Sequence, residues 1–226
     1  LSLYDRLRSR SDIVIVDCPG KFNYSKMSNL GASIAPDGVH VFLNNDISMP
    51  HREWLAPLID WAMRPDVGAV GARLLFDSGR LQHGGVTIGM GGYAGHTSHN
   101  AAGDSTGYLD RLKVAHELSA VTGACLAVAA EKFSAVGGFD EDRYPVELND
   151  IDLCLKLAAK GMKTVMCPEA ELIHHQSASR GFSYRPFTRY KIERGNFKNS
   201  WLNVIRDDPY YHPAMSLFSS IPSLDG

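Results

Sequence analysis

Three groups of polar side chains in this sequence have the chemistry to bind a metal ion or move a proton. The first is Asn44-Asn45-Asp46, directly after the apolar run Val39–Leu43. That run is expected to be a buried strand, and open α/β sheets bind ligands just beyond the carboxyl ends of their strands. A carboxylate there can hold a divalent cation, which in turn holds a diphosphate. A simple polar turn is the alternative, since Asn and Asp are good turn formers.

The second group is acidic and lies where a helix is expected to begin. It comprises Glu147, Asn149, Asp150 and Asp152. Asn149 can cap the helix, and the two aspartates would lie in its first turn, where the helix dipole favours anions. That structural role explains them by itself. The functional alternative is that one carboxylate faces a cleft and acts as a general base.

The third group is the pair His174-His175, at the end of a short apolar run. Adjacent strand residues point to opposite faces, so at most one of the two faces a cleft. A neutral imidazole is a good ligand for a metal such as Mn²⁺, although a hydrogen-bonded structural histidine fits equally well. The order of the three groups is more informative than any one alone: acid after a strand, acids opening a helix, histidine on a later strand.

The elements that position these groups alternate between strands and helices. Strands are expected at residues 13–16, 39–43, 67–75, 124–129, 163–167 and 171–174. Helices are expected at residues 25–35, 50–63, 131–136, 148–160 and 186–206. This alternation predicts an α/β fold with a mostly parallel central sheet flanked by helices. No repeat or linker divides the chain, so we predict one domain over residues 1–226, in which residues 186–226 form a helical tail.

The middle of the chain is rich in glycine and histidine. Eight glycines from Gly84 to Gly107 are interspersed with His83, His96 and His99. This composition predicts a long, mobile loop, and such loops are often functional. It would cover or shape a binding site, or be a plain surface loop.

Composition excludes several classes of protein. A chain of 226 residues suffices for one domain with a real core. Its net charge of −2 argues against a nucleic-acid binder. No apolar run approaches the ~20 residues that span a bilayer, so no transmembrane segment is predicted. None of the four cysteines forms a C-x-x-C pair, and we expect buried thiols in a reducing compartment. They are Cys18, Cys125, Cys154 and Cys167.

Five segments together resemble the inverting glycosyltransferases of family 2, of the bacterial surface-polysaccharide type. The resemblance extends from about Phe22 to Leu217. Asn44-Asn45-Asp46 resembles the DXD-type motif of that family. The other segments are VTGAC at 121–125, GGFD at 137–140 with ELNDIDLCL at 147–155, ELIHH at 171–175 with SASRG at 177–181, and DPYYHP at 208–213.

The resemblance implies a GT-A fold and a hexosyltransferase-type activity. A sugar would move from a UDP- or dTDP-linked donor to a saccharide acceptor, with inversion. By position, Asp150 would be the catalytic base, and Asp46 and His174 would bind Mn²⁺ or Mg²⁺. The expected donor- and acceptor-binding residues are Asn44, Asn45, Thr122, Gly123, Ala124, Asn149, Asp152 and His83.

Two departures from the family pattern concern charge and the front of the chain. Only the last acid of the DXD-type motif is kept, as Asp46, and Asn149 replaces the first acid of the usual acid pair before Asp150. The strand–turn–helix–strand that binds the nucleotide in the family is not found before Ile13. Residues 1–20 are therefore interpreted as a remnant of the donor-binding half.

Two other functions stay open. Without its donor half, the chain would be a non-catalytic carbohydrate-binding or scaffold piece. A metal-dependent phosphoesterase would use the same acids and His174. The family also implies polysaccharide biosynthesis in the cytoplasm, with peripheral membrane association left open. All of this requires Asp46, Asp150 and His174 to meet around one pocket.

Overall fold

The computed structural model describes residues 3–175 and 187–224. The segment 177–181, which completes the histidine-containing resemblance, lies outside the described residues. Within them, no helix is both long and apolar enough to cross a membrane.

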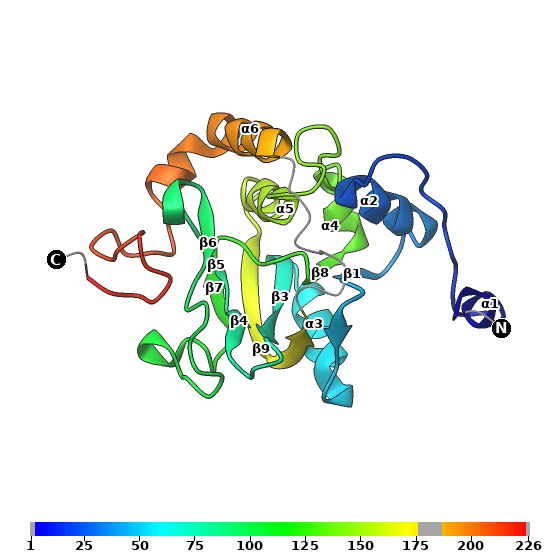
Figure 1. Cartoon of the computed structure of the whole chain (residues 1–226), viewed down its shortest axis with the longest axis horizontal. Coiled ribbons are helices and arrows are strands. Elements are labelled where there is room, and N and C mark those ends of the chain that lie inside the picture. The colour runs from blue at the N-terminus through cyan, green and yellow to red at the C-terminus, as the bar shows by residue number, and fades with distance from the viewer. Residues whose placement is uncertain (1–2, 176–186, 225–226) are drawn as a thin grey trace.

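A seven-stranded sheet forms the centre of the molecule (Figure 1). Its main path runs β1-β8-β3-β9-β2, with β4 paired to β3 and β7 paired to β9. The strands are β1 (Val39–Leu43), β2 (Ile47–Ser48), β3 (Val67–Leu75), β4 (Leu81–His83), β7 (His116–Leu118), β8 (Cys125–Ala129) and β9 (Lys163–His174).

The prediction of a mostly parallel sheet is wrong. Among the described strands, only β3 and β9 pair in parallel, and the other pairings are antiparallel. Strands β1, β3 and β9 do share one direction, as an alternation of strands and helices requires. The late strand β8, however, inserts between β1 and β3 in the opposite direction. Local sequence cannot reveal such an insertion, because it depends on pairing between distant segments.

Helices cover both faces of the sheet. Helices α2 (Tyr24–Ile34), α4 (Ala130–Ala135), α5 (Asn149–Ala158) and α6 (Phe187–Arg206) contribute to one core, whereas α3 (Leu55–Ala62) packs on the other. Strand β8 contributes side chains to both cores: Leu126 and Val128 face the α5 side, and Cys125 and Ala127 face α3. This alternation is the period of two that a strand buried on both faces requires.

The front of the chain differs from the prediction. Residues 13–16 are not a strand, and Val14 is 69% exposed. No described strand lies beside this run to satisfy its backbone, so β-branched side chains alone do not make it a strand. A short helix, α1 (Leu3–Arg8), precedes it. Helix α2 begins at Tyr24, one residue before the prediction, because Asn23 caps it by accepting a hydrogen bond from the Lys26 amide at 2.9 Å.

The glycine- and histidine-rich segment is not one continuous loop, because part of it forms strands. Strands β5 (Val86–Ile88) and β6 (Ala94–His96) form a separate two-stranded antiparallel sheet. Val86 and Ile88 are buried, so this hairpin contributes apolar side chains to the core. Gly89 adopts a φ of +90° where the hairpin turns, a conformation that favours glycine. Three 3₁₀ turns complete the described elements: η1 (Arg52–Trp54), η2 (Met90–Gly92) and η3 (Tyr108–Asp110).

Smaller differences concern element boundaries and the thiols. The two strands predicted at 163–167 and 171–174 are one strand, β9, whose register shifts in between. Pro57 lies in the first turn of α3, where its missing N–H costs no helical hydrogen bond. All four cysteines are free; three are buried and Cys18 is partly exposed.

Candidate active site

The turn between β1 and β2 places Asp46 beside His174. Asp46 Oδ1 lies 3.1 Å from His174 Nε2, and the two side chains are only 11% and 9% exposed. The pairing of Ile47 with His174 across β2 and β9 fixes this approach. Asn44 Nδ2 lies 3.5 Å from the same imidazole nitrogen. Asn45, by contrast, is exposed on the turn.

The separation of Asp46 and His174 suits two ligands of one cation. Ligand bonds of about 2.1 Å that meet at about a right angle place the two ligand atoms about 3 Å apart. Across the described ranges, no group of three or more His, Cys, Asp and Glu side chains is arranged to hold a metal. A cation here would thus take the rest of its ligands from substrate and water, as Mg²⁺ commonly does.

The neighbouring histidine points elsewhere. His175 hydrogen-bonds to Ser48 and Asp77 through its two ring nitrogens. Its backbone N–H donates to the Asp46 carbonyl at 2.9 Å, which ties β9 to the metal-binding turn. The two adjacent imidazoles therefore diverge, as the alternation of strand side chains predicted.

Asp150 lies in the first turn of α5 and is held by backbone amides. Its Oδ2 accepts a hydrogen bond from the Gly123 amide at 2.7 Å, and its Oδ1 accepts one from the Ile151 amide at 2.9 Å. Burial raises the pKa of the carboxyl above its ordinary value, even though the two amides favour the ionised form; the charge of Glu147 adds to the rise. Ionised Asp150 is therefore a stronger base than an aspartate in water.

Residues 122–124 join the two halves of the site. The backbone N–H of Asn44 donates to the Ala124 carbonyl at 2.9 Å, and the backbone N–H of Gly123 donates to Asp150 Oδ2. Thr122 Oγ1 accepts from the Ala124 amide at 3.3 Å, which stiffens the turn. A Cβ on Gly123 would lie 3.3 Å from the Cβ of Asp150, so a larger residue would crowd the base. The predicted residues Asn44, Thr122, Gly123, Ala124 and Asp150 thus form one connected cluster.

The backbone before α5 is strained. Leu148 has a φ of +63°, rare for a residue with a Cβ. Glu193 of α6 is 1% exposed and accepts hydrogen bonds from the Val146 and Glu147 amides at 3.1 and 2.6 Å. Such strain costs about 1–3 kcal/mol and persists only where surrounding contacts enforce it, often at functional sites. Sequence reasoning missed Glu193, because its partners are 46 and 47 residues away.

Asn149 is not the helix cap that the sequence predicted. The cap position of α5 is Leu148, which makes no side-chain cap hydrogen bond. The side-chain Nδ2 of Asn149 instead donates to the Val146 carbonyl at 3.1 Å. Asn149 is buried at 3% exposure and supports the strained turn, so its described contacts are structural.

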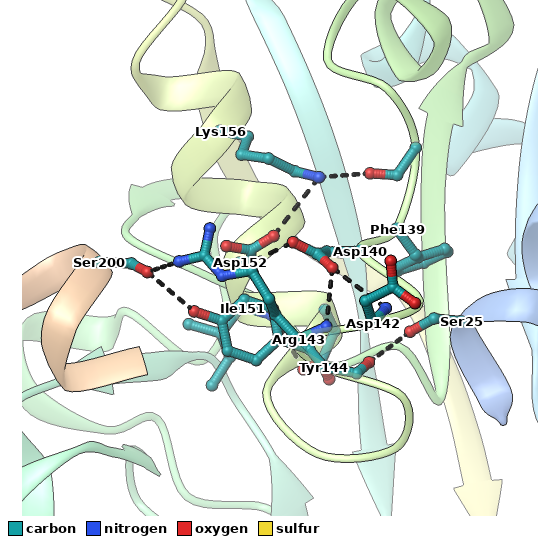
Figure 2. A network of polar contacts seen from close by, with 12 residues as sticks. Ser25, Phe139, Asp140, Asp142, Arg143, Tyr144, Ile151, Asp152, Lys156 and Ser200 are labelled. Carbon is teal, nitrogen blue, oxygen red and sulfur yellow. Dashed lines mark hydrogen bonds and ion pairs between the residues drawn. The ribbon is translucent and has the colours of Figure 1, made fainter. Parts of the chain in front are cut away.

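Asp152 faces away from the cluster, against the prediction that it binds substrate. Its Oδ1 accepts a hydrogen bond from Trp201 Nε1 at 2.9 Å, and its Oδ2 lies 3.4 Å from Lys156 Nζ. Figure 2 shows the Asp152 carboxylate turned toward Lys156 on the same helix, with Ser200 of α6 nearby. The side chain is 4% exposed. Asp152 therefore fastens α6 to α5, because residues 150 and 152 lie on different sides of the helix.

His83 reaches the cluster from β4. It is fully buried, and its Nε2 accepts a weak hydrogen bond from the Thr122 amide at 3.4 Å. Its Nδ1 lies 2.8 Å from Nδ1 of His96 on β6. Burial lowers the pKa of His83, and burial with the charges of His99 and His174 lowers the pKa of His96 to about 4. Both imidazoles are therefore neutral near pH 7.

A cavity in the structure lies away from this chemistry. It encloses about 170 Å³ and is lined by Gly84, Thr97, Arg111 and Tyr210 among others, but by none of Asp46, Asp150 and His174. We locate the candidate active site by the acid, imidazole and amide groups instead, because the connected polar cluster carries the groups that can do chemistry.

Several known proteins are similar in sequence to this chain. No protein-family model matches the chain. An uncharacterized Sinorhizobium fredii protein, y4gI, is 42% identical over 198 residues, and the O-antigen biosynthesis protein RfbC of Myxococcus xanthus is 38% identical over 197. Each alignment covers 87% of this chain, but only 22% and 15% of the relative. The chain thus spans about a fifth or less of their length.

A shorter match and a solved structure complete the comparison. An N-acetylglucosaminyl-diphospho-decaprenol L-rhamnosyltransferase of Mycobacterium tuberculosis is 43% identical over 61 residues, which are 27% of this chain and 20% of that protein. The structure of GalNAc-T7 with UDP, GalNAc and Mn²⁺ superposes with a TM-score of 0.58 at 14% identity, over 82% of this chain and 36% of that one. The fold is therefore that of the GT-A glycosyltransferases, and the named relatives support a glycosyltransferase family.

Proposed function

We propose that this chain carries the catalytic centre of a metal-assisted, inverting glycosyltransferase of family 2. The observation that carries the proposal is the connected cluster in which the turn 44–46, His174, residues 122–124 and Asp150 are linked by hydrogen bonds. It brings a two-ligand cation site and a partly buried base to the same edge of the sheet. A metal-assisted transfer with inversion would use both groups.

In this proposal Asp150 acts as the general base. It accepts the proton of an acceptor hydroxyl, and that oxygen attacks the anomeric carbon of the donor sugar. The bond from this carbon to the diphosphate oxygen breaks as the new one forms, and the electron pair leaves with the diphosphate. Attack from the face opposite the leaving group inverts the configuration. The raised pKa of Asp150 favours this role, because a base works best near the operating pH.

Asp46 and His174 would hold the divalent cation, Mn²⁺ or Mg²⁺. Their spacing of 3.1 Å fits the role, as argued above. When bound, the cation would neutralise charge that develops on the departing diphosphate. The structure with UDP and Mn²⁺ that shares this fold is consistent with such a cation. Asn44 would orient His174 or contact the donor, and the 122–124 turn would line the sugar site.

The donor is proposed to be a UDP- or dTDP-linked sugar and the acceptor a growing surface polysaccharide. The name of the Myxococcus relative, an O-antigen biosynthesis protein, supports the polysaccharide role. The cytoplasmic location, a peripheral membrane contact and the single-domain organisation stay predictions. So does the remnant role of residues 1–20, whose described part contains only α1 as regular structure.

Calorimetry separates this proposal from a non-catalytic carbohydrate-binding piece. The chain would be titrated with UDP and with dTDP, each with and without Mn²⁺. Binding that requires Mn²⁺ and is weakened in Asp46→Asn supports the enzyme. Metal-independent binding of oligosaccharides, with no binding of either nucleotide, would favour the carbohydrate-binding piece. Phosphate release from simple esters without an acceptor would favour a phosphoesterase.

A further inference from the structure

The histidine pair beside the cluster has a hydrogen-bond pattern that fixes where its protons are. The Thr122 amide donates to His83 Nε2, so this nitrogen carries no proton. A neutral imidazole then has its proton on the other nitrogen, and His83 Nδ1–H donates to His96 Nδ1 across 2.8 Å. His96 Nδ1 is an acceptor, so the proton of a neutral His96 is on Nε2.

The two histidines differ in what remains for a ligand. Both ring nitrogens of His83 are used within the protein, and the side chain is fully buried. His96 retains one N–H donor, Nε2–H, that bonds to no group in the part of the chain that the structure describes. The His96 ring packs against the His99 ring, with 5.9 Å between their centroids. The charge of His174 contributes to the lowered pKa of His96. The Nε2–H of His96 is therefore the polar group that this pair leaves available to a ligand, and His83 links the pair to the turn 122–124 of the cluster.

We propose that His96 is a substrate-positioning residue whose Nε2–H donates a hydrogen bond to a hydroxyl oxygen of the transferred sugar, with His83 holding it in that tautomer. The inference rests on the proposed function. A sugar hydroxyl is favoured over a phosphate oxygen because the hydrogen-bond pattern keeps both imidazoles neutral, and a neutral donor suits a neutral acceptor. Residues 122–123 connect His83 to the base, so the pair and Asp150 are held by one turn.

Two substitutions of His96 separate this role from a structural one. His96→Gln keeps an amide N–H near the position of Nε2 but loses the acceptor for His83. His96→Asn keeps a polar atom near Nδ1 and loses the donor toward the sugar. One hydrogen bond to a neutral group corresponds to roughly a 3- to 10-fold change. We expect His96→Asn to raise the KM for the nucleotide sugar by that factor with little change in kcat, and His96→Gln to stay within about twofold of wild type.

The reverse order, with His96→Gln impaired and His96→Asn normal, would show that His96 merely supports His83 and would overturn the proposal. Two variants with wild-type KM would overturn it as well. Circular dichroism and thermal melting of both variants establish that the compared proteins are folded.

Nitrogen-15 NMR of the histidine rings tests the same idea without turnover. In the free chain at pH 7 we expect His83 protonated on Nδ1 only and His96 on Nε2 only, with His83→Gln and His96→Asn used for assignment. Adding UDP-glucose or dTDP-rhamnose with Mg²⁺ should shift the His96 Nε2 signal, and UDP or dTDP alone should not.

A cationic His96, a proton on its Nδ1, or a Nε2 signal unmoved by a nucleotide sugar that visibly binds elsewhere would overturn the inference. The tautomers are read in the absence of substrate. A chain with the expected tautomers and a shifting His96 signal, but no sugar transfer, would therefore count against the proposed function and support the His96 contact.

Discussion

Replacing Asp150 by Asn tests the assignment of the base most directly. The substitution keeps size and shape but removes the group that would accept the proton. It also exchanges one of two acceptor oxygens for an NH₂, so only one of the hydrogen bonds from the Gly123 and Ile151 amides survives. Losing one such bond costs about 1 kcal/mol, and removal of a buried charge offsets part of it. The fold should therefore persist.

The catalytic effect should be far larger than the structural one. A positioned general base contributes about 10²- to 10⁴-fold to a rate, so kcat for sugar transfer should fall by that factor. The affinity for the nucleotide should change little, because Asp150 contacts none of the proposed cation ligands directly. Release of nucleoside diphosphate measures the first quantity, and calorimetry with UDP and Mn²⁺ measures the second.

Asp152→Asn is the matched control. It makes the same chemical change two residues away, at a carboxylate that bonds to Trp201 and Lys156 instead of the cluster. We expect a change in unfolding free energy of no more than about 1–2 kcal/mol and a nearly normal kcat. If Asp150→Asn turned over normally, or if both variants lost activity equally, the assignment of the base would be refuted.

The pH dependence of transfer should report the same carboxyl. The active form is the carboxylate, and burial raises its pKa above the ordinary 3.8. Activity should therefore be lost as pH falls through a value higher than that of an exposed aspartate, and the profile of kcat/KM measures it. Because the folded pKa is raised, ionised Asp150 also lowers stability as pH rises through the same window. An acidic limb at or below 3.8, in protein shown to be folded, would contradict this.

Three further predictions concern the cation ligands, a buried lysine and the close approach of Gly71 to the Val121 side chain. Removing either proposed ligand, by Asp46→Asn or His174→Ala, should weaken Mn²⁺ binding by at least about 10-fold in calorimetry; unchanged binding would refute the site. Lys132 donates hydrogen bonds of 2.6–2.8 Å to three carbonyls near the end of α3. Lys132→Met should therefore lower the free energy of unfolding, measured in urea, by about 3–5 kcal/mol. A decrease of less than about 1 kcal/mol would contradict this. Gly71→Ala would place its new Cβ too close to the Val121 side chain and should cost about 1–3 kcal/mol of unfolding free energy. Adding Val121→Gly should recover part of this loss, and thermal melts of Gly71→Ala and of the double variant measure both effects.

Much of the local structure was predictable because it rests on near neighbours. Asn23 caps α2 three residues before the amide it binds, and the apolar run Val67–Leu75 is a buried strand as expected. The order of the polar groups, together with the resemblance, correctly indicated the GT-A fold. The strand predicted at residues 13–16 was wrong. Its β-branched residues favour a strand, but a strand also needs a neighbouring strand to satisfy its backbone hydrogen bonds.

The sequence by itself determined which chemistry is present: a carboxylate after β1, carboxylates opening α5, and a histidine ending β9. Only the tertiary structure decided which of these groups meet. It placed Asp46 beside His174 and Asp150 beside Gly123. It also turned Asp152 toward Trp201, and it placed His83 of β4 beside His96 of β6. The reason is physical. Residue type and spacing set local conformation. The antiparallel entry of β8 between β1 and β3, which brings these groups together, depends instead on pairing between residues 55 to 90 positions apart.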